Sequence, residues 1–375
     1  MQGRGALWSG LGFLLAALAA PQRRQTSAQK RSKGVVQERE PVAALLPRHL
    51  QRSLAVALEQ RAGSVRGRFA PSPTGVMHRG NRRTALLSWL EVRLQGGEWL
   101  LRIDDLDTPR NRPGAEASIL ADLQWLGLHW DGPVVRQSER RGLYASVLSA
   151  LRRGGWLYPC RCSRRMLADL SAPHGAPPAY PGTCRDRVPA WGPLAGRLPS
   201  WRLRQPPAPL AWRETLPQER HPNEASGADA VVRRADGFLA YHLATAVDEL
   251  WLGIATVLRG EDLAGSTAAQ VALMASLAAE PPQYCHVPLW RDAEGERLAK
   301  RQAPAPELDG RSGERDAAAA AREIGALAAS LELVPPGQSL SALELLQSLD
   351  LDRFYACLDR ERTGAVTVAT KPAHP

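Results

Sequence analysis

A turn-rich segment, residues 71–75, leads into a stretch that reads His78-Arg79-Gly80-Asn81. Proline and glycine predict a tight loop here, and the free backbone N–H groups at the start of the helix that follows favour an anion. His78 and Asn81 are three residues apart, so both side chains face one side of this helix start and could reach one phosphate. The spacing therefore predicts a phosphate site. A histidine without a ligand is the alternative, and it leaves the loop unexplained.

Three of the five cysteines lie close together in the sequence, which favours a metal site over disulfide bonds. With one nearby tyrosine they offer four ligands, enough for a tetrahedral Zn²⁺ site, although tyrosine is an uncommon zinc ligand. The predicted ligands are Cys160, Cys162, Tyr180 and Cys184. Bound zinc would hold together a segment that has few apolar residues. The alternative is a loop with free thiols, and Cys285 and Cys357 are expected to be core or surface thiols.

Strand-like and helix-like segments alternate from Ser64 onward, which is typical of a parallel sheet wound on both faces by helices. Ligands of such sheets bind at the carboxyl ends of the strands. Segment 171–199, rich in Pro, Gly and Arg, is expected to leave the core, and the residues after 349 show no pattern. The expected strands are 67–70, 98–103, 254–259 and 286–290, and the expected helices are 81–94, 114–126, 140–153, 267–278, 317–331 and 340–349.

The composition is that of an ordinary globular protein, with 375 residues of which 44% are apolar and 23% charged. The formal charge of +10 is concentrated in residues 1–63, which hold ten Lys and Arg against three Glu. The overall charge is therefore a weak sign of a nucleic-acid partner. No apolar run reaches the roughly 18 residues of a membrane-spanning helix, so no membrane partner is expected.

Residues 1–63 are expected to lie outside the fold, and three explanations for them stay open. The apolar stretch 6–20 has the outline of a signal peptide, and the Arg-rich stretch 22–33 that of an organelle transit segment. The third explanation is a start codon assigned upstream of the true one. Because the rest of the chain has an intracellular character, the predicted location is the cytoplasm.

The segment 68–86 resembles the first signature of class I glutamyl-tRNA synthetases, a His-Ile-Gly-His element that binds ATP. Asn81 is an ordinary variant in this family, whereas Arg79 stands where an apolar residue is expected. The stretches 102–105, 240–244 and 257–262 match further family motifs in the same order. The resemblance covers about residues 67–304 and implies a Rossmann-like, doubly wound parallel sheet with a small zinc-bearing insertion. It also implies that His78, Gly80 and Asn81 bind ATP and that His78 stabilises charge on the α-phosphate.

The resemblance implies a site for L-glutamate as well. Two carboxylates call for two guanidinium groups, because their planar fork meets a carboxylate bidentately. Arg68 and Arg259 are the candidates, with Asp104 for the ammonium group and a hydroxyl from Tyr241. Asp104 replaces a family Glu and shortens the reach by one methylene. The family's glutamate-binding run corresponds to Arg68, Phe69, Ala70, Pro71 and Ser72.

Family members also carry a Lys-Met-Ser-Lys-Ser loop that closes on the ATP phosphates. Its place is taken by Arg297-Leu298-Ala299-Lys300-Arg301. The resemblance implies that Lys300 binds ATP and takes part in catalysis, with Mg²⁺ accompanying the nucleotide. Ala299 lacks the hydroxyl of the family serine, so slow adenylation is expected. A charged surface loop is the alternative.

The segment that follows Lys300 is too short for the anticodon-binding region of a full glutamyl-tRNA synthetase. This feature and the Cys-x-Cys…Tyr-x-x-x-Cys pattern resemble the glutamyl-queuosine tRNA(Asp) synthetases. That resemblance implies activation of L-glutamate with ATP and transfer of the glutamyl group to the queuosine base in the anticodon of tRNA(Asp), with a structural zinc near the RNA. The expected organisation is a core over 64–304 with an insertion at about 157–226, an Ala-rich helical segment over 305–375, and a monomer.

Two other functions stay open: a minimal glutamyl-tRNA synthetase that charges tRNA(Glu), and a degenerate core that binds RNA or nucleotide without catalysis. Arginines flank the predicted zinc ligands and are candidates for RNA contact, although a solvated face is equally compatible with them. They are Arg161, Arg164, Arg165, Arg185 and Arg187.

Overall fold

The fold is built on two groups of parallel strands that lie side by side. The computed structural model describes residues 42–163, 166, 180–187, 190–206, 210–216, 229–290 and 316–363. Strands β1 (Arg66–Phe69), β2 (Glu98–Ile103) and β3 (Val135–Arg136) pair in that order, and β7 (Thr256–Gly260) pairs with β8 (Gln283–Val287). The Ala255 N–H donates to the Arg66 carbonyl at 2.7 Å, which places β7 beside β1. The strand order is therefore β3-β2-β1-β7-β8.

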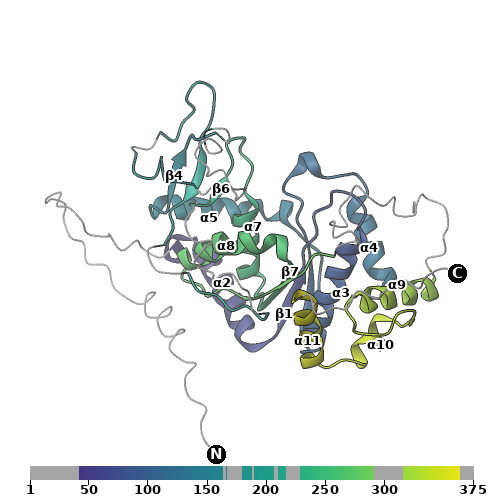
Figure 1. Cartoon of the computed structure of the whole chain (residues 1–375). Helices are drawn as coiled ribbons and strands as arrows, with labels where there is room; N and C mark the ends of the chain where they lie inside the picture. The colour runs from purple at the N-terminus through teal and green to yellow at the C-terminus, as the bar shows by residue number, and fades with distance from the viewer. Residues whose placement is uncertain are drawn as a thin grey trace, which may run out of the picture.

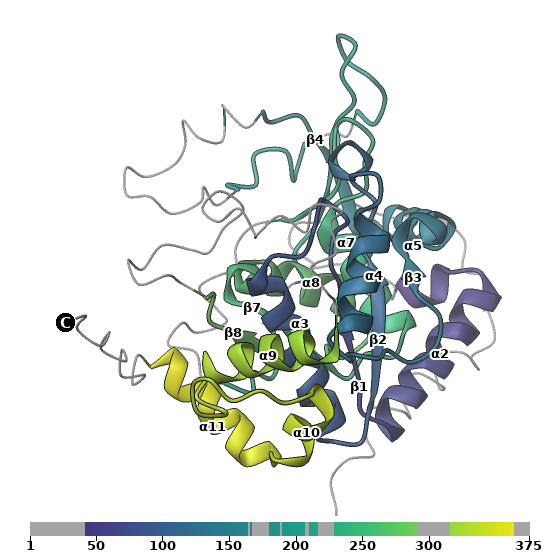
Figure 2. The same ribbon diagram turned by 90° about the vertical axis from the view of Figure 1, so that its right-hand side faces the viewer.

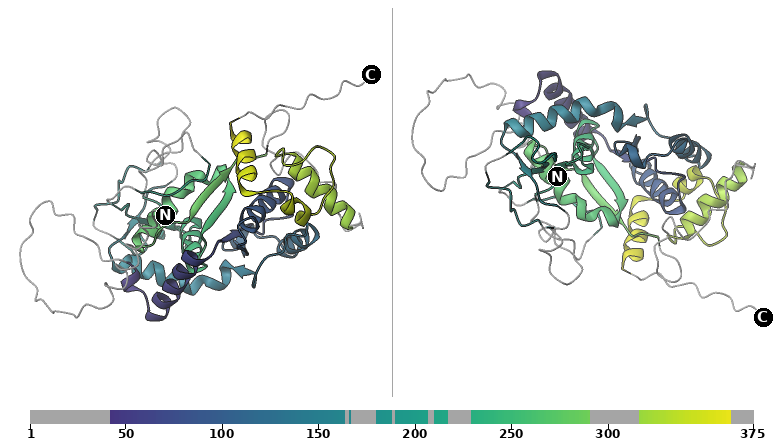
Figure 3. Two further views of the ribbon diagram at one scale, coloured as in Figure 1. Left: turned by 90° about the horizontal axis from the view of Figure 1, so that it is seen from below. Right: turned by 90° about the horizontal axis from the view of Figure 1, so that it is seen from above.

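Helices cover both faces of these strands, as the alternation of the sequence predicts (Figures 1 and 3). One hydrophobic cluster joins α3 (Arg79–Arg93) and α4 (Ala115–Trp125) to β1 and β2. A second cluster joins the helices of the other face to β7, and these are α2 (Arg48–Gly63), α5 (Arg141–Arg153), α7 (Tyr241–Trp251) and α8 (Ala264–Ser276). The α/β, doubly wound arrangement is confirmed.

Gly67 in β1 allows the closest contact between the sheet and α3. A Cβ atom at this position would lie 2.3 Å from Cγ2 of Val92 and 3.3 Å from Cγ2 of Thr256. A side chain here would push α3 away from the strand that it follows. The carboxyl-terminal end of α3 is thus held close to β1 and to the start of β7.

A separate antiparallel sheet carries the cysteine-rich segment and projects from the parallel strands at the top of Figure 1. It consists of β4 (Leu157–Cys160), β5 (Ser200–Leu203) and β6 (Val231–Arg233). Cys160, the last residue of β4, pairs with Ser200, the first residue of β5. The first predicted zinc ligand therefore stands at one end of this sheet.

Residues 42–63 correct the expectation that the whole of segment 1–63 lies outside the fold. They form a 3-10 helix, η1 (Val42–Leu45), and the helix α2, which packs on α7. Val42, Leu46, Leu54 and Ala57 are buried, and Leu54 and Ala57 face one side of α2 because they are three residues apart. Residues 1–41 lie outside the described part of the chain.

Three helices near the carboxyl end pack against α3, in front of it in Figure 2. They are α9 (Ala317–Ala329), α10 (Ala342–Gln347) and α11 (Leu351–Arg362). The first two agree with the expected helices, but α11 falls where no element was expected. It buries Phe354, Cys357 and Leu358, which are spaced at i, i+3 and i+4 among charged residues.

The remaining differences from the expected elements are local. Strand β8 ends at Val287 instead of continuing to Trp290, because Pro288 has no N–H group for the ladder. The two-residue strand β3 is too short to show a pattern in the sequence. No helix in the described ranges is long and apolar enough to cross a bilayer. The short 3-10 helices are η2 (Thr108–Arg110), η3 (Gln137–Arg140) and η5 (Glu261–Leu263).

Candidate active site

His78 caps the amino end of α3, at the predicted phosphate site. Its Nδ1 accepts a hydrogen bond from the Asn81 N–H at 3.2 Å. A Cβ on Gly80 would lie 3.1 Å from this Nδ1, so glycine leaves room for the ring. With Nδ1 accepting, the proton of the neutral ring is on Nε2. The cap therefore turns His78 into a donor suited to a phosphate oxygen.

Arg79, the unusual residue of the signature, has a structural partner in α9. Its Nε and Nη2 donate to the two carboxylate oxygens of Glu323 at 3.1 and 3.0 Å. The guanidinium group also lies 5.2 Å from the ring centre of Trp290. A charged residue is thus accommodated here because α9 supplies a carboxylate beside the amino end of α3.

Arg68 lies buried near the carboxyl end of β1, and a carboxylate from α7 orients it. Its Nε donates to Oε1 of Glu249 at 2.9 Å, and its Nη1 donates to the Leu258 carbonyl at 3.3 Å. Arg68 and the neighbouring Arg102 outweigh the effect of burial and lower the pKa of Glu249. The carboxylate stays ionised, and three of the five N–H groups of Arg68 have no acceptor among the described residues.

Asp104 follows β2 and forms an ion pair within the same buried region. Its carboxylate accepts from Nε and Nη2 of Arg102 at 2.7 and 3.3 Å, and its backbone N–H donates to the Pro71 carbonyl at 3.0 Å. Burial raises the pKa of Asp104 to about 6, although Arg102 and Arg68 oppose this. The predicted ammonium-binding residue therefore lies close to Arg68, but it is already paired with Arg102.

Arg259 lies buried in β7 and is held by three side chains. Its Nε donates to His286 Nε2 at 3.1 Å, Nη1 to Gln270 at 2.8 Å and Nη2 to Thr267 at 2.8 Å. Within the described part of the chain, two N–H groups of the guanidinium remain for a ligand. No motif in the sequence marks these partners, which are His286, Thr267 and Gln270.

Tyr241 begins α7, and the residue is 38% exposed. Its ring centre lies 5.8 Å from that of His242, whose pKa is lowered by burial and by Arg259. The other residues of the predicted glutamate-binding run differ in exposure. Phe69 is buried and stacks on Trp99, whereas Ser72 is exposed.

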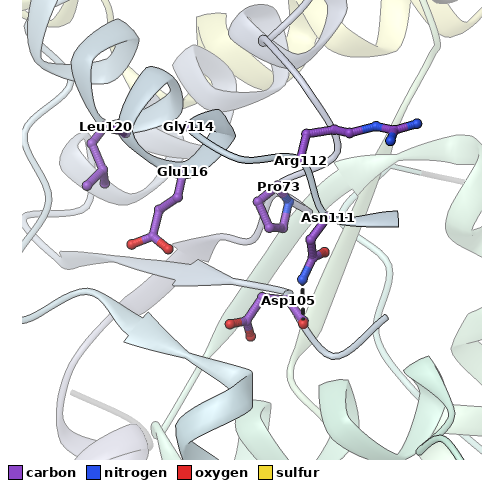
Figure 4. Close-up of a pocket in the computed structure, with 8 residues that line it drawn as sticks. Pro73, Asp105, Asn111, Arg112, Gly114, Glu116 and Leu120 are labelled. Atoms are coloured by element: carbon purple, nitrogen blue, oxygen red, sulfur yellow. Dashed lines mark hydrogen bonds between the residues drawn. The ribbon is translucent and has the colours of Figure 1, made fainter. Parts of the chain in front are cut away.

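An open cavity of about 450 Å³ lies beside the loops that leave β1 and β2 (Figure 4). The Asp105 carboxylate accepts from the Ser138 N–H at 2.7 Å, and its carbonyl accepts from the Asn111 amide at 2.8 Å. Charged side chains from the segment around the start of α4 also line it, a feature that the sequence analysis missed. The lining residues are Pro73, Asp105, Asn111, Arg112, Gly114, Glu116, Ala117 and Leu120.

The predicted zinc ligands come together at the end of β4. The sulfur atoms of Cys160, Cys162 and Cys184 lie within 4.8 Å of one another, and those of Cys162 and Cys184 are 3.7 Å apart. Bonds of about 2.3 Å to a tetrahedral zinc would put neighbouring sulfurs about 3.8 Å apart, so the thiols fit the ion. The Tyr180 hydroxyl lies 3.5 Å from Cys160 Sγ and accepts from the Cys184 N–H at 2.8 Å.

The charge around Cys160 also suits a metal ligand. Burial alone would raise the pKa of this thiol, but hydrogen bonds from Tyr180, the Cys162 backbone and Arg202 lower it. The Arg202 guanidinium lies 3.8 Å from the ring centre of Tyr180. Metal ions bind the thiolate, so these contacts favour coordination.

Two of the arginines proposed for RNA contact form hydrogen bonds within the insertion. Arg161 donates to the carbonyls of residues 190, 192 and 197, and Arg185 forms a bidentate pair with the buried Asp229 at 2.7 and 2.8 Å. Arg187 is exposed. Arg164, Arg165 and the second signature with Lys300 lie outside the described residues.

The chain is similar in sequence to known proteins. The family model for the catalytic domain of class I tRNA synthetases (E and Q) matches residues 64–316. A glutamyl-Q tRNA(Asp) synthetase of Prochlorococcus marinus (strain MIT 9313) is 54% identical over 82% of this chain and 95% of its own length. A second, from Symbiobacterium thermophilum, is 45% identical over 63% of this chain and 77% of its own.

A solved structure gives the same fold. The glutamate-tRNA synthetase of Elizabethkingia anophelis superposes with a TM-score of 0.62 at 27% sequence identity. The match covers 77% of this chain and 66% of that synthetase, so the chain spans a little under two thirds of its length.

Proposed function

Since this chain belongs to the family of class I tRNA synthetases for glutamate and glutamine, we propose that it activates L-glutamate with ATP and transfers the glutamyl group to the queuosine base in the anticodon of tRNA(Asp). The observation that carries the activation step is the pair of buried, oriented guanidinium groups of Arg68 and Arg259 on adjacent strands. The similarity to glutamyl-Q tRNA(Asp) synthetases over 82% of the chain supports the acceptor.

In the first step, the α-carboxylate of glutamate attacks the α-phosphorus of ATP. A carboxyl-oxygen–phosphorus bond forms, and the bond to the departing pyrophosphate breaks. The substrate carboxylate is already a nucleophile, so this step needs positioning and charge stabilisation more than a general base. Arg68 and Arg259 hold the substrate, Asp104 accepts from its ammonium group, and the Nε2–H of His78 donates to a phosphate oxygen.

Lys300 and magnesium are the two further groups that would contact the ATP phosphates. In this proposal Lys300, in the second signature, binds the phosphates, and so do Gly80 and Asn81 at the start of α3. Magnesium would neutralise phosphate charge when bound with ATP. The zinc held by Cys160, Cys162, Tyr180 and Cys184 is structural and fixes the loop at the end of β4.

In the second step, a hydroxyl of queuosine attacks the carbonyl carbon of the glutamyl-adenylate. An ester bond forms, AMP leaves, and the hydroxyl proton is released. The open cavity beside Asp105 and Asn111 offers the nucleoside an approach to the β1 and β2 loops. The proposal also includes a monomeric enzyme in the cytoplasm, with residues 64–304 as its catalytic unit.

Transfer of labelled glutamate tests this function. Purified protein with ATP is offered queuosine-containing tRNA(Asp), unmodified tRNA(Asp) and tRNA(Glu). Label on the first RNA alone supports the proposal. Label on tRNA(Glu) would make the protein a minimal glutamyl-tRNA synthetase, and absence of label from all three would indicate a core that binds without catalysis.

A further inference from the structure

We propose that Glu214 and His286 position Arg259 for glutamate, so that the insertion contributes a residue to the amino-acid site. The inference rests on the proposed role of Arg259 in binding a substrate carboxylate. Glu214 does not contact Arg259 itself: it acts through His286. Both are therefore positioning residues.

The directions of the hydrogen bonds around His286 determine where its proton lies. The Nε of Arg259 can only donate, so His286 Nε2 must be the acceptor in their 3.1 Å contact. The neutral ring then carries its proton on Nδ1. This nitrogen lies 3.0 and 3.1 Å from the two carboxylate oxygens of Glu214, which accept that proton. One orientation of the ring thus satisfies both partners.

The opposite tautomer would bring two donors together. With its proton on Nε2, His286 could donate to the Thr267 hydroxyl, 3.2 Å away. It would nevertheless face the Nε–H of Arg259, and Glu214 would face a nitrogen that has no proton. Both His286 and Arg259 are 3% exposed, so water cannot readily replace the lost hydrogen bond. Glu214 therefore selects the tautomer that holds the Arg259 guanidinium in place.

Other contacts hold Glu214 in register with β8. The Thr215 N–H donates to the Tyr284 carbonyl, and the Tyr284 N–H donates to the Arg213 carbonyl, both at 2.8 Å. The Trp212 indole N–H donates to the Glu214 carboxylate at 2.9 Å. Residues 210–216 thus add a short parallel bridge to β8, next to His286.

This segment belongs to the chain between β5 and β6, the sheet whose other strand ends at Cys160. The insertion therefore does two things: one end carries the thiol cluster, and a later segment passes the amino-acid site. A side chain of the insertion becomes necessary for glutamate binding.

Replacement of Glu214 tests the inference through ATP–pyrophosphate exchange with glutamate. In Glu214→Leu we expect the KM for glutamate to rise about tenfold or more, as for loss of a hydrogen bond to a charged network. The KM for ATP and the exchange kcat should stay within about twofold, because no phosphate contact changes. Glu214→Gln keeps an acceptor for the Nδ1–H, so it should recover most of the glutamate affinity.

Glu98→Leu is the matched control. It removes a carboxylate that pairs with Arg66 at the amino end of β2, away from the site. Its KM for glutamate should equal that of the wild type. An unchanged KM in Glu214→Leu, or a Gln variant as impaired as the Leu variant, would overturn the inference.

If Glu214→Leu does not fold, two variants of His286 test the same inference. The amide oxygen of His286→Gln can accept from Arg259 at the place of Nε2, whereas His286→Asn places its amide near Nδ1 and loses that acceptor. We expect the Gln variant to bind glutamate more tightly than the Asn variant. Equal affinities would contradict the proposal.

Nitrogen NMR of the histidine rings supplies a readout that needs no activity. Wild-type His286 should show a protonated Nδ1 and an unprotonated Nε2. A protonated Nε2 would refute the inference even if exchange is observed. If the ring has the expected form but no exchange with glutamate occurs, the proposed function fails and the positioning network stands.

Discussion

Oε1 of Glu249 lies 2.9 Å from Nε of Arg68, and both side chains are buried. The same oxygen accepts from Nη1 of Arg102 at 3.4 Å. A carboxylate from α7 thus links the strand that carries Arg68 to the strand that precedes Asp104. Glu249 is thus the acidic residue that joins Arg68 to Arg102, which also pairs with Asp104 and Asp248.

Glu249→Ala should therefore destabilise the protein and weaken glutamate binding. Loss of one partner of a buried ion pair costs about 3–5 kcal/mol, because the remaining charges are left without compensation. Urea unfolding of variant and wild type measures this loss. Glu98→Ala removes a partly exposed pair and should cost less than about 1 kcal/mol. Similar losses in the two variants would contradict the central role of Glu249.

The raised pKa of Asp104, about 6, predicts the pH dependence of glutamate activation. The residue must be ionised to accept from the ammonium group of the substrate. Below about pH 6 it becomes protonated, and kcat/KM for glutamate should fall about tenfold per pH unit. Exchange kinetics between pH 5 and 8 measure the profile. Asp104→Asn should lower kcat/KM and remove its fall below about pH 6. If the variant keeps this fall, another group is responsible for it.

Glu91 in α3 should make the free energy of unfolding fall as the pH rises. An ion-paired carboxylate has the opposite effect. Burial raises the pKa of Glu91 to about 7, although Thr256 and Tyr355 donate to it at 3.0 and 3.1 Å. The folded state therefore holds the proton more tightly than the unfolded state, and this contribution to stability is lost as the pH rises from about 4.5 through 7.

Unfolding of Glu91→Gln and wild type at pH 5 and pH 8 measures the effect. Each pKa unit corresponds to about 1.4 kcal/mol. Between pH 5 and pH 8, the free energy of unfolding of the variant relative to the wild type should therefore rise by about 2–3 kcal/mol. Glu98→Gln, an exposed carboxylate, should show no such change. A difference independent of pH would mean that Glu91 is ionised in the folded protein.

The thiol cluster predicts about one zinc per chain in freshly purified protein. Cys184→Ser should reduce the zinc content to less than about half an equivalent, because it removes one of four ligands. Elemental analysis measures the metal. Cys357→Ser, in α11 and far from the cluster in sequence, is the control and should keep its zinc. Removal of zinc should impair transfer to RNA more than exchange with pyrophosphate, since Arg68 and Arg259 lie on other elements.

The core elements could be predicted because their patterns are strong. After β1, the turn residues 71–75 and the helical spacing of the leucines in α3 follow one another in one short, continuous stretch. Helix α11 was missed because its apolar residues are few and are separated by charged ones. Helix α2 was missed because the whole basic segment 1–63 was expected to lie outside the fold. Their burial depends on the surfaces that they meet, and a single sequence does not display these.

The residues of the candidate site likewise fall into those that a motif marks and those that only the folded structure identifies. Arg68, Asp104 and Arg259 could be named from motifs, and the structure places them on the carboxyl side of β1, β2 and β7. Glu249, His286 and Glu214 could not, because each acts through a neighbour distant in sequence. Arg102 is an instructive case: it lies within a recognised motif, yet its pairing with Asp104 and Glu249 emerges only when β2 lies beside α7.

Helices α9 and α10 pack on α3, although they are separated from it by more than 200 residues of the chain. The helix that presents His78 is synthesised well before the helices that cover its outer face. A nascent chain on the ribosome therefore exposes apolar side chains of α3 until residues 317–362 emerge. The outer face of α3 is covered only after α9 and α10 have been made, so chains interrupted before residue 317 would expose apolar surface to chaperones and proteases.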